Sequence, residues 1–426
     1  MTYKEFFALA EKKGIEKIQI TEETKKDNSV YFINQQLADY TDSEKITYQI
    51  KAEIAGKTEQ LHTEYLDESI IDLMIEKINT TDSNYADEYL SKKENDNIDK
   101  QPDINITKEI EIIKELSNKI EEYPYAKSIE IAYGEAYYKT RIINNQNVDI
   151  TKDSHYYDLY VEGSAEKKDV ISSYSNSILV NDKSRINFLN IIKNVLDLAT
   201  LATTKRKLET KKYNVILSNE VASKIINHLP NMLSAENIHQ KKSCLENKLN
   251  EKVFSDKLTI VEEPKNKEYP GYSIFDKEGT NTINKELIKN GIIKNYLYDI
   301  KEAKIDNISS TGNKYNSIFV KNMYIIPGTK TEEELFKTID KGIYITDYMG
   351  SQGSSINTTS GNISMQVFGY IIENGKLVCG FEPAVLTTTI FELLTNIEEI
   401  GNNLKFVMDT AASPSLYIKD ISIAGE

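Results

Sequence analysis

The first part of the chain alternates between helical and strand-like patterns of apolar residues. Segments 2–13 (TYKEFFALAEKK) and 67–79 (DESIIDLMIEKIN) repeat apolar residues every three or four positions, which predicts two amphipathic helices. The alternating stretches between them predict strands: EKIQITEE, VYFINQQLADYT and KITYQIKAEIAG. We therefore expect residues 1–90 to form an N-terminal α/β unit.

A charged, polar segment follows this unit. Residues 91–105 (SKKENDNIDKQPDIN) offer few residues for a core, so they predict a linker or an exposed loop. Thr107 is a suitable N-cap for the helical pattern of 107–123. Two strands and a long helix are then predicted: SIEIAYGEAYYKTRII, HYYDLYVEGSAEK and NFLNIIKNVLDLATLATTKRKL. We expect residues 106–211 to form a central α/β unit.

The pattern changes at Lys212. The apolar strand YNVILS ends at Ser218, which can cap a helix whose apolar face is formed by Val221, Ala222, Ile225, Ile226 and Leu229. Of the 18 glycines, only Gly14, Gly56, Gly134 and Gly163 precede residue 271. The later glycines separate short strands: GIIKNYLYD, SIFVKNMYIIPG, GIYITDYMG, ISMQVFGYIIENGKLV and SLYIKDISIAG. Residues 212–426 therefore predict a mostly antiparallel β-rich domain, a sheet or partly closed barrel, within an α+β fold.

Composition limits the possible partners. The chain of 426 residues has 52 Lys+Arg against 66 Asp+Glu, a net charge of -14, which disfavours binding to nucleic-acid phosphates. The two cysteines, Cys244 and Cys379, lie far apart in the sequence and form no CxxC pair. This fits a protein of a reducing compartment without a disulfide framework. The N-terminal segment does not resemble a secretory signal, and no apolar run has the length of a membrane span. We expect a cytoplasmic protein that binds neither membrane nor nucleic acid.

Histidines are the first candidates for chemistry. Two of the four lie in 225–239 (IINHLPNMLSAENIH), where Glu236 precedes His239 by three residues. The HExxH zinc motif is absent, and a single ExxH matches only part of a carboxylate-bridged diiron site, so a solvated helix is the simpler interpretation. We expect Pro230 to end or kink the helix just beyond His228. His62 and His155 lie in strand-like segments without neighbouring ligand patterns.

Nucleophiles and paired carboxylates offer two further candidates. The segment 350–364 is rich in hydroxyls and glycines but lacks the GxSxG and phosphate-loop motifs, so a polar turn is the simpler interpretation. Cys379 has no histidine near it in the sequence, because no histidine follows His239. Asp276 and Glu278, if on a strand, would point the same way and could share a cation or raise one pKa. A strand end entering a turn is the simpler interpretation.

An ordered series of segments resembles the PmbA/TldD family of peptidase-related proteins. The resemblance covers residues 212–426 and rests on FDKEGTNT, LIKNGIIKNYLYD, STGN (310–313), IIPG (325–328), TTSGNISMQVFGYIIENGK and SPSLYIKDISIAG. The resemblance implies two branches. The TldD-like branch carries HExxxH, in which two histidines bind zinc and the glutamate acts as general base, and a further cysteine lies near the C terminus. The PmbA (TldE) branch lacks these ligands.

The chain is more similar to the PmbA branch. Aligned with HExxxH, it has Asn227, His228 and Met232 in place of His, Glu and His, and 403–416 contains no cysteine. The resemblance therefore implies no metal, cofactor or catalytic residue in this chain. It implies a heterodimer with a TldD-like HExxxH subunit whose zinc cleaves short or unfolded peptides. A homodimer of the isolated chain is an alternative.

Three glycine-flanked segments are the candidate substrate cleft of such a subunit. They are Asp276, Glu278 and Gly279; Ser310, Thr311, Gly312 and Asn313; and Ser360 and Gly361. Exposed strand edges there would pair with an extended peptide. Two other functions remain open from the sequence. One is a self-sufficient hydrolase using Ser354 or Cys379, and the other is a regulatory binding protein, in line with the family's older label as a modulator of DNA gyrase.

Overall fold

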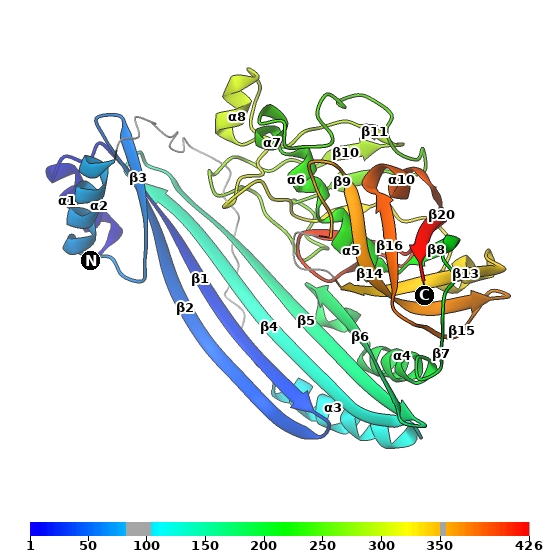
Figure 1. The fold of residues 1–426 in the computed structure, drawn as a ribbon. Coiled ribbons are helices and arrows are strands. Elements are labelled where there is room, and N and C mark those ends of the chain that lie inside the picture. Colours follow the sequence, from blue (N-terminus) through cyan, green and yellow to red (C-terminus); the bar gives the residue numbers. More distant parts are fainter. Residues whose placement is uncertain (82–103, 350–354, 426) are drawn as a thin grey trace.

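A long curved sheet lies beside a β-rich C-terminal body (Figure 1). The structure is a computed structural model that describes residues 1–81, 104–349 and 355–425. The predicted linker at 91–105 lies almost entirely outside the described residues. The mixture of helices and mostly antiparallel sheets confirms the α+β class.

The long sheet has six antiparallel strands in the order β3-β2-β1-β4-β5-β6. The strands are β1 (Lys17–Ile33), β2 (Gln36–Ile54), β3 (Lys57–Thr63), β4 (Ala126–Asn144), β5 (Asp149–Lys167) and β6 (Val170–Val180). β1 and β4 pair from Gln19 opposite Asn144 to Ile33 opposite Glu130. This pairing joins strands from both predicted α/β units into one sheet, and the division into units remains a prediction.

Helices cover the two ends of the long sheet (Figure 1). α1 (Tyr3–Lys12) and α2 (Glu68–Thr80) pack on one end through a core that includes Phe6, Ile20 and Met74. α3 (Thr107–Ser117) and α4 (Phe188–Leu201) pack on the other end, around Ile113, Ile131 and Val195. The middle of the strands lies toward the C-terminal body instead.

The sequence misplaced the start of α3. Thr107 is the first helical residue, and Ile106 occupies the N-cap position without a side-chain cap. The Asn105 side chain accepts a hydrogen bond from the Thr107 N–H at 2.9 Å, which satisfies one free backbone donor of the first turn. The helix also ends earlier than predicted and continues as a 3₁₀ turn, η1 (Asn118–Glu122).

Five strands of the C-terminal body form a closed circuit. β13 pairs with β8, β8 with β20, β20 with β16, β16 with β14, and β14 again with β13. Their bounds are β8 (Lys211–Leu217), β13 (Lys341–Met349), β14 (Asn362–Glu373), β16 (Ala384–Thr389) and β20 (Leu416–Ala424). β7 (Lys205–Arg206), β15 (Lys376–Phe381) and β17 (Ile397–Ile400) extend this sheet. The predicted partly closed barrel is therefore confirmed.

A second sheet of short strands packs beside the barrel in the order β11-β10-β9-β12-β19-β18. The strands are β9 (Ile260–Glu262), β10 (Lys285–Lys289), β11 (Ile292–Ile293), β12 (Met323–Ile325), β18 (Lys405–Phe406) and β19 (Ala411–Ser413). The strands predicted at 291–299 and 317–328 are much shorter than expected. In the first, the backbone beyond β11 bonds elsewhere, since Leu297 N–H donates to Leu233 O and Tyr298 N–H to the Thr311 hydroxyl.

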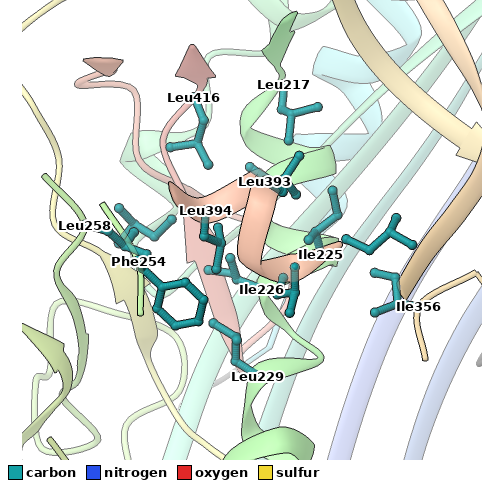
Figure 2. Close-up of a cluster of buried hydrophobic side chains, with 14 of the residues drawn as sticks. Leu217, Ile225, Ile226, Leu229, Phe254, Leu258, Ile356, Leu393, Leu394 and Leu416 are labelled. Atoms are coloured by element: carbon teal, nitrogen blue, oxygen red, sulfur yellow. The ribbon is translucent and has the colours of Figure 1, made fainter. Parts of the chain in front are cut away.

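Two buried helices fill the core of the body, α5 (Asn219–Ile226) and α10 (Ile390–Thr395) (Figure 2). Ser218 caps α5 by accepting the Val221 N–H at 3.2 Å, as predicted. α5 ends at Ile226, so Pro230 neither ends nor kinks it. Pro230 lies in the first turn of the next helix, α6 (Leu229–Leu233), where its missing N–H costs no hydrogen bond.

The remaining helices are short: η2 (Lys183–Arg185), α7 (Ala235–His239), α8 (Ile300–Ile305) and α9 (Glu332–Lys337). Across the described ranges, none of the helices combines the length and the apolar character that crossing a membrane requires.

Candidate substrate groove and the degenerate motif position

The junction of α5 and α6 holds the three residues that align with the zinc motif. Asn227 is the C-cap of α5, and His228 is partly buried between the helices, where burial lowers the pKa of its imidazole. Met232 is 0% exposed and belongs to the main apolar core. An amide, one imidazole and a thioether enclosed in apolar side chains do not fit zinc, which prefers thiolate, imidazole and carboxylate ligands. Within the described ranges, no group of three or more His, Cys, Asp or Glu side chains could hold a metal ion.

A groove runs beside this junction, and we call it the α6 groove. Its cavity of about 450 Å³ is lined by Asn227, Pro230, Asn231, Ser234, Glu236 and Asn237 and by residues 317–320. The Asn237 side chain donates to the Asn231 carbonyl oxygen at 2.8 Å. Amide side chains both donate and accept hydrogen bonds, so this lining can match the alternating donors and acceptors of an extended peptide backbone.

The predicted segment 310–313 supports the wall of the α6 groove from behind. Asn313 is fully buried, and its side-chain amide donates to the Phe319 carbonyl oxygen at 3.0 Å and to both oxygens of Glu262 at 2.8 and 3.1 Å. The Phe319 N–H returns a bond to Asn313 O at 2.9 Å. Asn313 therefore positions the groove wall and does not itself line the groove.

The other members of this segment fix the backbone of the neighbouring chain. The hydroxyls of Ser310 and Thr311 donate to Tyr298 O at 3.0 and 3.1 Å. Gly312 has φ +72°, and a Cβ there would lie 2.6 Å from Asn281 O, so only glycine fits without a shift.

Asp276 and Glu278 lie in a turn that follows the bridge at Phe275, as the favoured interpretation expected, and not side by side on a strand. Asp276 accepts the N–H groups of Glu278, Thr280 and Lys314 at 3.0, 2.8 and 2.9 Å. Glu278 accepts the Ile300 N–H at 3.0 Å instead. The turn forms because Gly279 adopts φ +69° and the Asp276 carboxylate satisfies the local backbone donors.

Both carboxyl groups have raised pKa values. Burial raises the pKa of Asp276 to about 6, against the backbone hydrogen bonds that lower it. Burial also raises the pKa of Glu278 to about 7, with a further contribution from Asp276. These groups can hold or release a proton near neutral pH, but they contact different partners and do not form one cation site.

The structure brings two of the three predicted cleft segments together. The Lys277 N–H donates at 2.7 Å to the carbonyl oxygen of Lys314, the residue that follows 310–313, which brings 276–279 next to that segment. The third segment has different neighbours. Gly361, at φ +78°, lies against the side chains of Ile390, Phe391 and Cys244. The N–H of Ser360 donates to the Asn357 side chain at 2.9 Å.

Of the two predicted nucleophiles, Ser354 and Cys379, the structure describes only Cys379. Ser354 lies outside the described residues. Cys379 is 1% exposed, and burial raises the pKa of its thiol. Burial also raises the pKa of Cys244 to about 11. A thiol in this state is a poor nucleophile at neutral pH, which disfavours a cysteine-dependent hydrolase.

His239 forms a cluster that the sequence did not reveal. Its Nδ1 lies 2.6 Å from Glu302 Oε2 and its Nε2 lies 3.1 Å from Asp306 Oδ1. Glu236, the carboxylate nearest in sequence, instead accepts from the Gln240 side chain at 3.1 Å. Both real partners come from α8 or its C-cap, more than sixty residues away, so local spacing carried no signal. The cluster ties α7 to α8.

This cluster makes stability depend on pH. Hydrogen bonds to Glu302 and Asp306 raise the pKa of His239 above its value in the unfolded chain, about 6.5. The stabilisation is therefore fully present below pH 6.5 and is lost as the pH rises through the folded-state pKa. We expect His239→Gln to lower the free energy of unfolding more at pH 6 than at pH 9, as measured by urea denaturation. His62→Gln is the control, because His62 is an exposed residue of β3. An equal loss of stability at both pH values for His239→Gln would contradict the prediction.

A substitution at Met232 tests whether the motif position can be converted to a ligand. We expect Met232→His to lower the free energy of unfolding by about 2–3 kcal/mol, because a polar ring would replace a thioether in an apolar core. Added zinc should not restore the loss. Met232→Leu should cost less than about 1.5 kcal/mol. Full recovery of stability by zinc would show that the site still accepts a metal.

The comparisons with known proteins define first the class and then the family. Residues 210–425 match the family model described as the PmbA/TldA metallopeptidase C-terminal domain. The barrel, the buried α5 and the α6 groove all lie within this match, so the chain is a metallopeptidase-related protein. The match covers half of the chain, and the chain belongs to the PmbA/TldD family.

Curated relatives are similar over the same region. The metalloprotease PmbA homolog of Buchnera aphidicola (subspecies Acyrthosiphon pisum) is 30% identical over 223 residues, 52% of this chain and 48% of that protein. Metalloprotease PmbA of Escherichia coli O157:H7 is 27% identical over 221 residues, 52% of this chain and 48% of that protein. The matched part thus spans about half the length of these relatives.

Solved structures are similar over nearly the whole chain. A Thermotoga maritima protein, named as a proposed modulator of a DNA gyrase, has a TM-score of 0.90 and 25% identity, covering 99% of this chain and 100% of its own. TldE from Thermococcus kodakarensis has a TM-score of 0.86 and 18% identity, covering 99% of each chain, which shows a shared fold.

Proposed function

We propose that this chain is the PmbA/TldE-like, non-catalytic subunit of a zinc metalloprotease complex that degrades or processes peptides and unfolded proteins. The observation that carries the proposal is the motif position itself. Asn227, His228 and a wholly buried Met232 stand where two histidines and a glutamate are required, beside a groove that is still open. A TldD-like subunit with an intact HExxxH motif would supply the zinc and the general base.

The role of this chain in such a complex is to hold the peptide. The α6 groove offers the side chains of Asn231 and Asn237 to an extended backbone, and Asn313 fixes its wall through the Phe319 carbonyl oxygen. We place the complex in the cytoplasm, since Cys244 and Cys379 are both free thiols.

The central experiment compares the isolated chain with the complex. The purified chain is incubated with a fluorescence-quenched, unstructured peptide, with and without zinc, and then with a TldD-like HExxxH subunit. We expect cleavage only with the second subunit, and a chelator should abolish it. Robust, chelator-sensitive cleavage by this chain alone would overturn the proposal. Size-exclusion chromatography of the same samples separates a heterodimer from a homodimer.

A substitution in the groove tests the peptide-holding role separately. In the complex, Asn231→Ala should raise KM for the peptide several-fold while kcat changes little, because the lost contact is made equally before and during the reaction. Asn190→Ala, on the exposed face of α4, is the matched control. An unchanged KM for Asn231→Ala would remove the groove from the proposal.

A regulatory function is the second candidate, favoured by the names of structural neighbours. The Thermotoga maritima protein and one from Bacteroides thetaiotaomicron are both named as proposed modulators of DNA gyrase. A pull-down from cells that returns gyrase without any TldD-like chain would favour this candidate over the peptidase subunit.

A further inference from the structure

A partly open cavity lies where the middle of the long sheet meets the C-terminal body, and we call it the seam cavity. Its volume is about 300 Å³. The sheet contributes Glu23 from β1, Tyr138 from β4, and Lys152 and Tyr156 from β5. The body contributes Asp276 and Tyr315, among others. The seam cavity is distinct from the α6 groove, because the two share no lining residue.

Lys152 is the unusual residue of the seam cavity. Its side chain is partly buried and lines the cavity. Nζ donates to Ser273 Oγ at 2.7 Å and to Phe275 O at 2.5 Å, and it lies 4.5 Å from the centre of the Phe275 ring. All of these partners are neutral. Within the described part of the chain, no carboxylate comes within ion-pair distance of this amine.

The other charged groups around the cavity already have partners. Lys277 pairs with Glu23 at 3.3 Å, and Lys321 pairs with Asp409. Asp276 accepts three backbone N–H groups, as described above. Burial and then the nearby Asp153 carboxylate raise the pKa of Tyr137. Among the described residues, Lys152 is thus the one lining lysine without a carboxylate partner.

The electrostatics of Lys152 agree with this geometry. Burial, followed by repulsion from Lys321, lowers the pKa of the Lys152 amine to about 7, although Asp276 and Glu23 act in the opposite direction. An ammonium group has three N–H donors, and protein atoms accept two of them. The third donor has no acceptor among the residues that the structure describes, and an anion in the cavity would supply one.

We propose that the seam cavity binds a small carboxylic acid whose carboxylate accepts a hydrogen bond from Lys152. Its apolar part would lie against the aromatic side chains of the lining, Tyr138, Tyr156, Tyr272 and Tyr315. A volume of about 300 Å³ is at the small end of ligand sites, which limits the ligand to the size of an amino acid or an aryl-acetic acid. The inference does not depend on the proposed peptidase function.

Binding of a carboxylate should be coupled to proton uptake. The anion stabilises the charged amine, so a lysine that is partly neutral above pH 7 gains a proton when the ligand binds. The tyrosines of the lining stay protonated, because burial raises the pKa values of Tyr156 and Tyr315 well above neutral. Affinity should therefore fall as the pH rises from 7 to 9.

Isothermal titration calorimetry with phenylacetate and L-phenylalanine tests the proposal. Phenylacetamide serves as the control ligand, because it has the shape of phenylacetate without the negative charge. We expect a carboxylate to bind at least tenfold more tightly than the amide at pH 7.5. Titrations in buffers of different ionisation enthalpy should show proton uptake, and the affinity should fall on the order of tenfold by pH 9, as expected for a lysine that titrates near pH 7. Equal binding of acid and amide, or no binding of either acid, would overturn the proposal.

Two variants complete the test. Lys152→Met should weaken carboxylate binding at least tenfold and abolish the proton uptake. Lys139→Met is the matched control, because Lys139 alternates with the cavity-lining Tyr138 and Thr140 on β4 and so faces the other side of the sheet. Unchanged binding by Lys152→Met would contradict the proposal. If that variant fails to fold by circular dichroism, the proton uptake of the wild-type chain still decides the outcome.

Discussion

Replacing Lys285 with methionine is expected to lower the free energy of unfolding by about 3–5 kcal/mol, because it leaves Glu262 as an uncompensated buried charge. The Lys285 amine lies 2.7 Å from Glu262 Oε2, and the two side chains are 5% and 2% exposed. Asn313 and the Lys321 N–H also bond to Glu262, but neither carries a compensating charge there. Urea denaturation monitored by circular dichroism measures the change.

Two controls separate the buried charge from the loss of a lysine in general. Lys248→Met removes the partner of Glu251 in an exposed pair and should cost less than about 1 kcal/mol. Combining Lys285→Met with Glu262→Gln should recover part of the loss, since the remaining group is then neutral. If Lys285→Met costs no more than Lys248→Met, the pair does not stabilise the fold in the way that its burial implies.

Gly369→Ala is expected to destabilise the barrel by at least about 3 kcal/mol. Gly369 lies on β14 opposite Ile345 of β13, next to an irregularity in the strand pairing. A Cβ at this position would lie 1.9 Å from Tyr344 O and 3.0 Å from the Cα of Ile345, both of which are backbone atoms. The two strands would have to separate at the pairing that closes the five-strand circuit. Thermal unfolding and expression level measure the effect.

The control for Gly369→Ala is a glycine without a steric conflict. Gly56 has φ +75°, but no atom lies within 4 Å of the place that a Cβ would occupy, so Gly56→Ala should cost only about 1 kcal/mol of backbone strain. Comparable losses for the two variants would mean that β14 can shift away from β13 at little cost.

Much of the secondary structure followed from local pattern, but the extent of the long strands did not. The sequence predicted 16–23 and 30–41 as separate stretches, because the charged run between them offers little to a core. In the structure, β1 continues through this run from Lys17 to Ile33. β2, which follows β1 directly, and the distant β4 pair with it on its two sides, so backbone hydrogen bonding within the sheet overrides the local composition.

The residues of the candidate sites also differ in how far the sequence could indicate them. The assignment of Asn227, His228 and Met232 as degenerate positions rests on the resemblance, which fixes their spacing, and it stays a prediction. The roles of Lys152 and Lys285 could not be predicted, since each is one lysine among many on a strand. The partner of Lys152 at Phe275 is more than one hundred residues away, and that of Lys285 at Glu262 is more than twenty residues away. The turn at Asp276 was the favoured interpretation, but the distant Lys314 N–H that its carboxylate accepts could not be read from the sequence.

The closed circuit of the barrel also has a consequence for protein synthesis. β20 lies between β8 and β16. The circuit therefore needs both β8, its first strand in the sequence, and β20, its last. The strands of the long sheet are all made before residue 181, and they can pair while translation continues. The barrel must wait until the ribosome has released residues 416–424, and until then its apolar interior around α5 stays exposed and prone to aggregation.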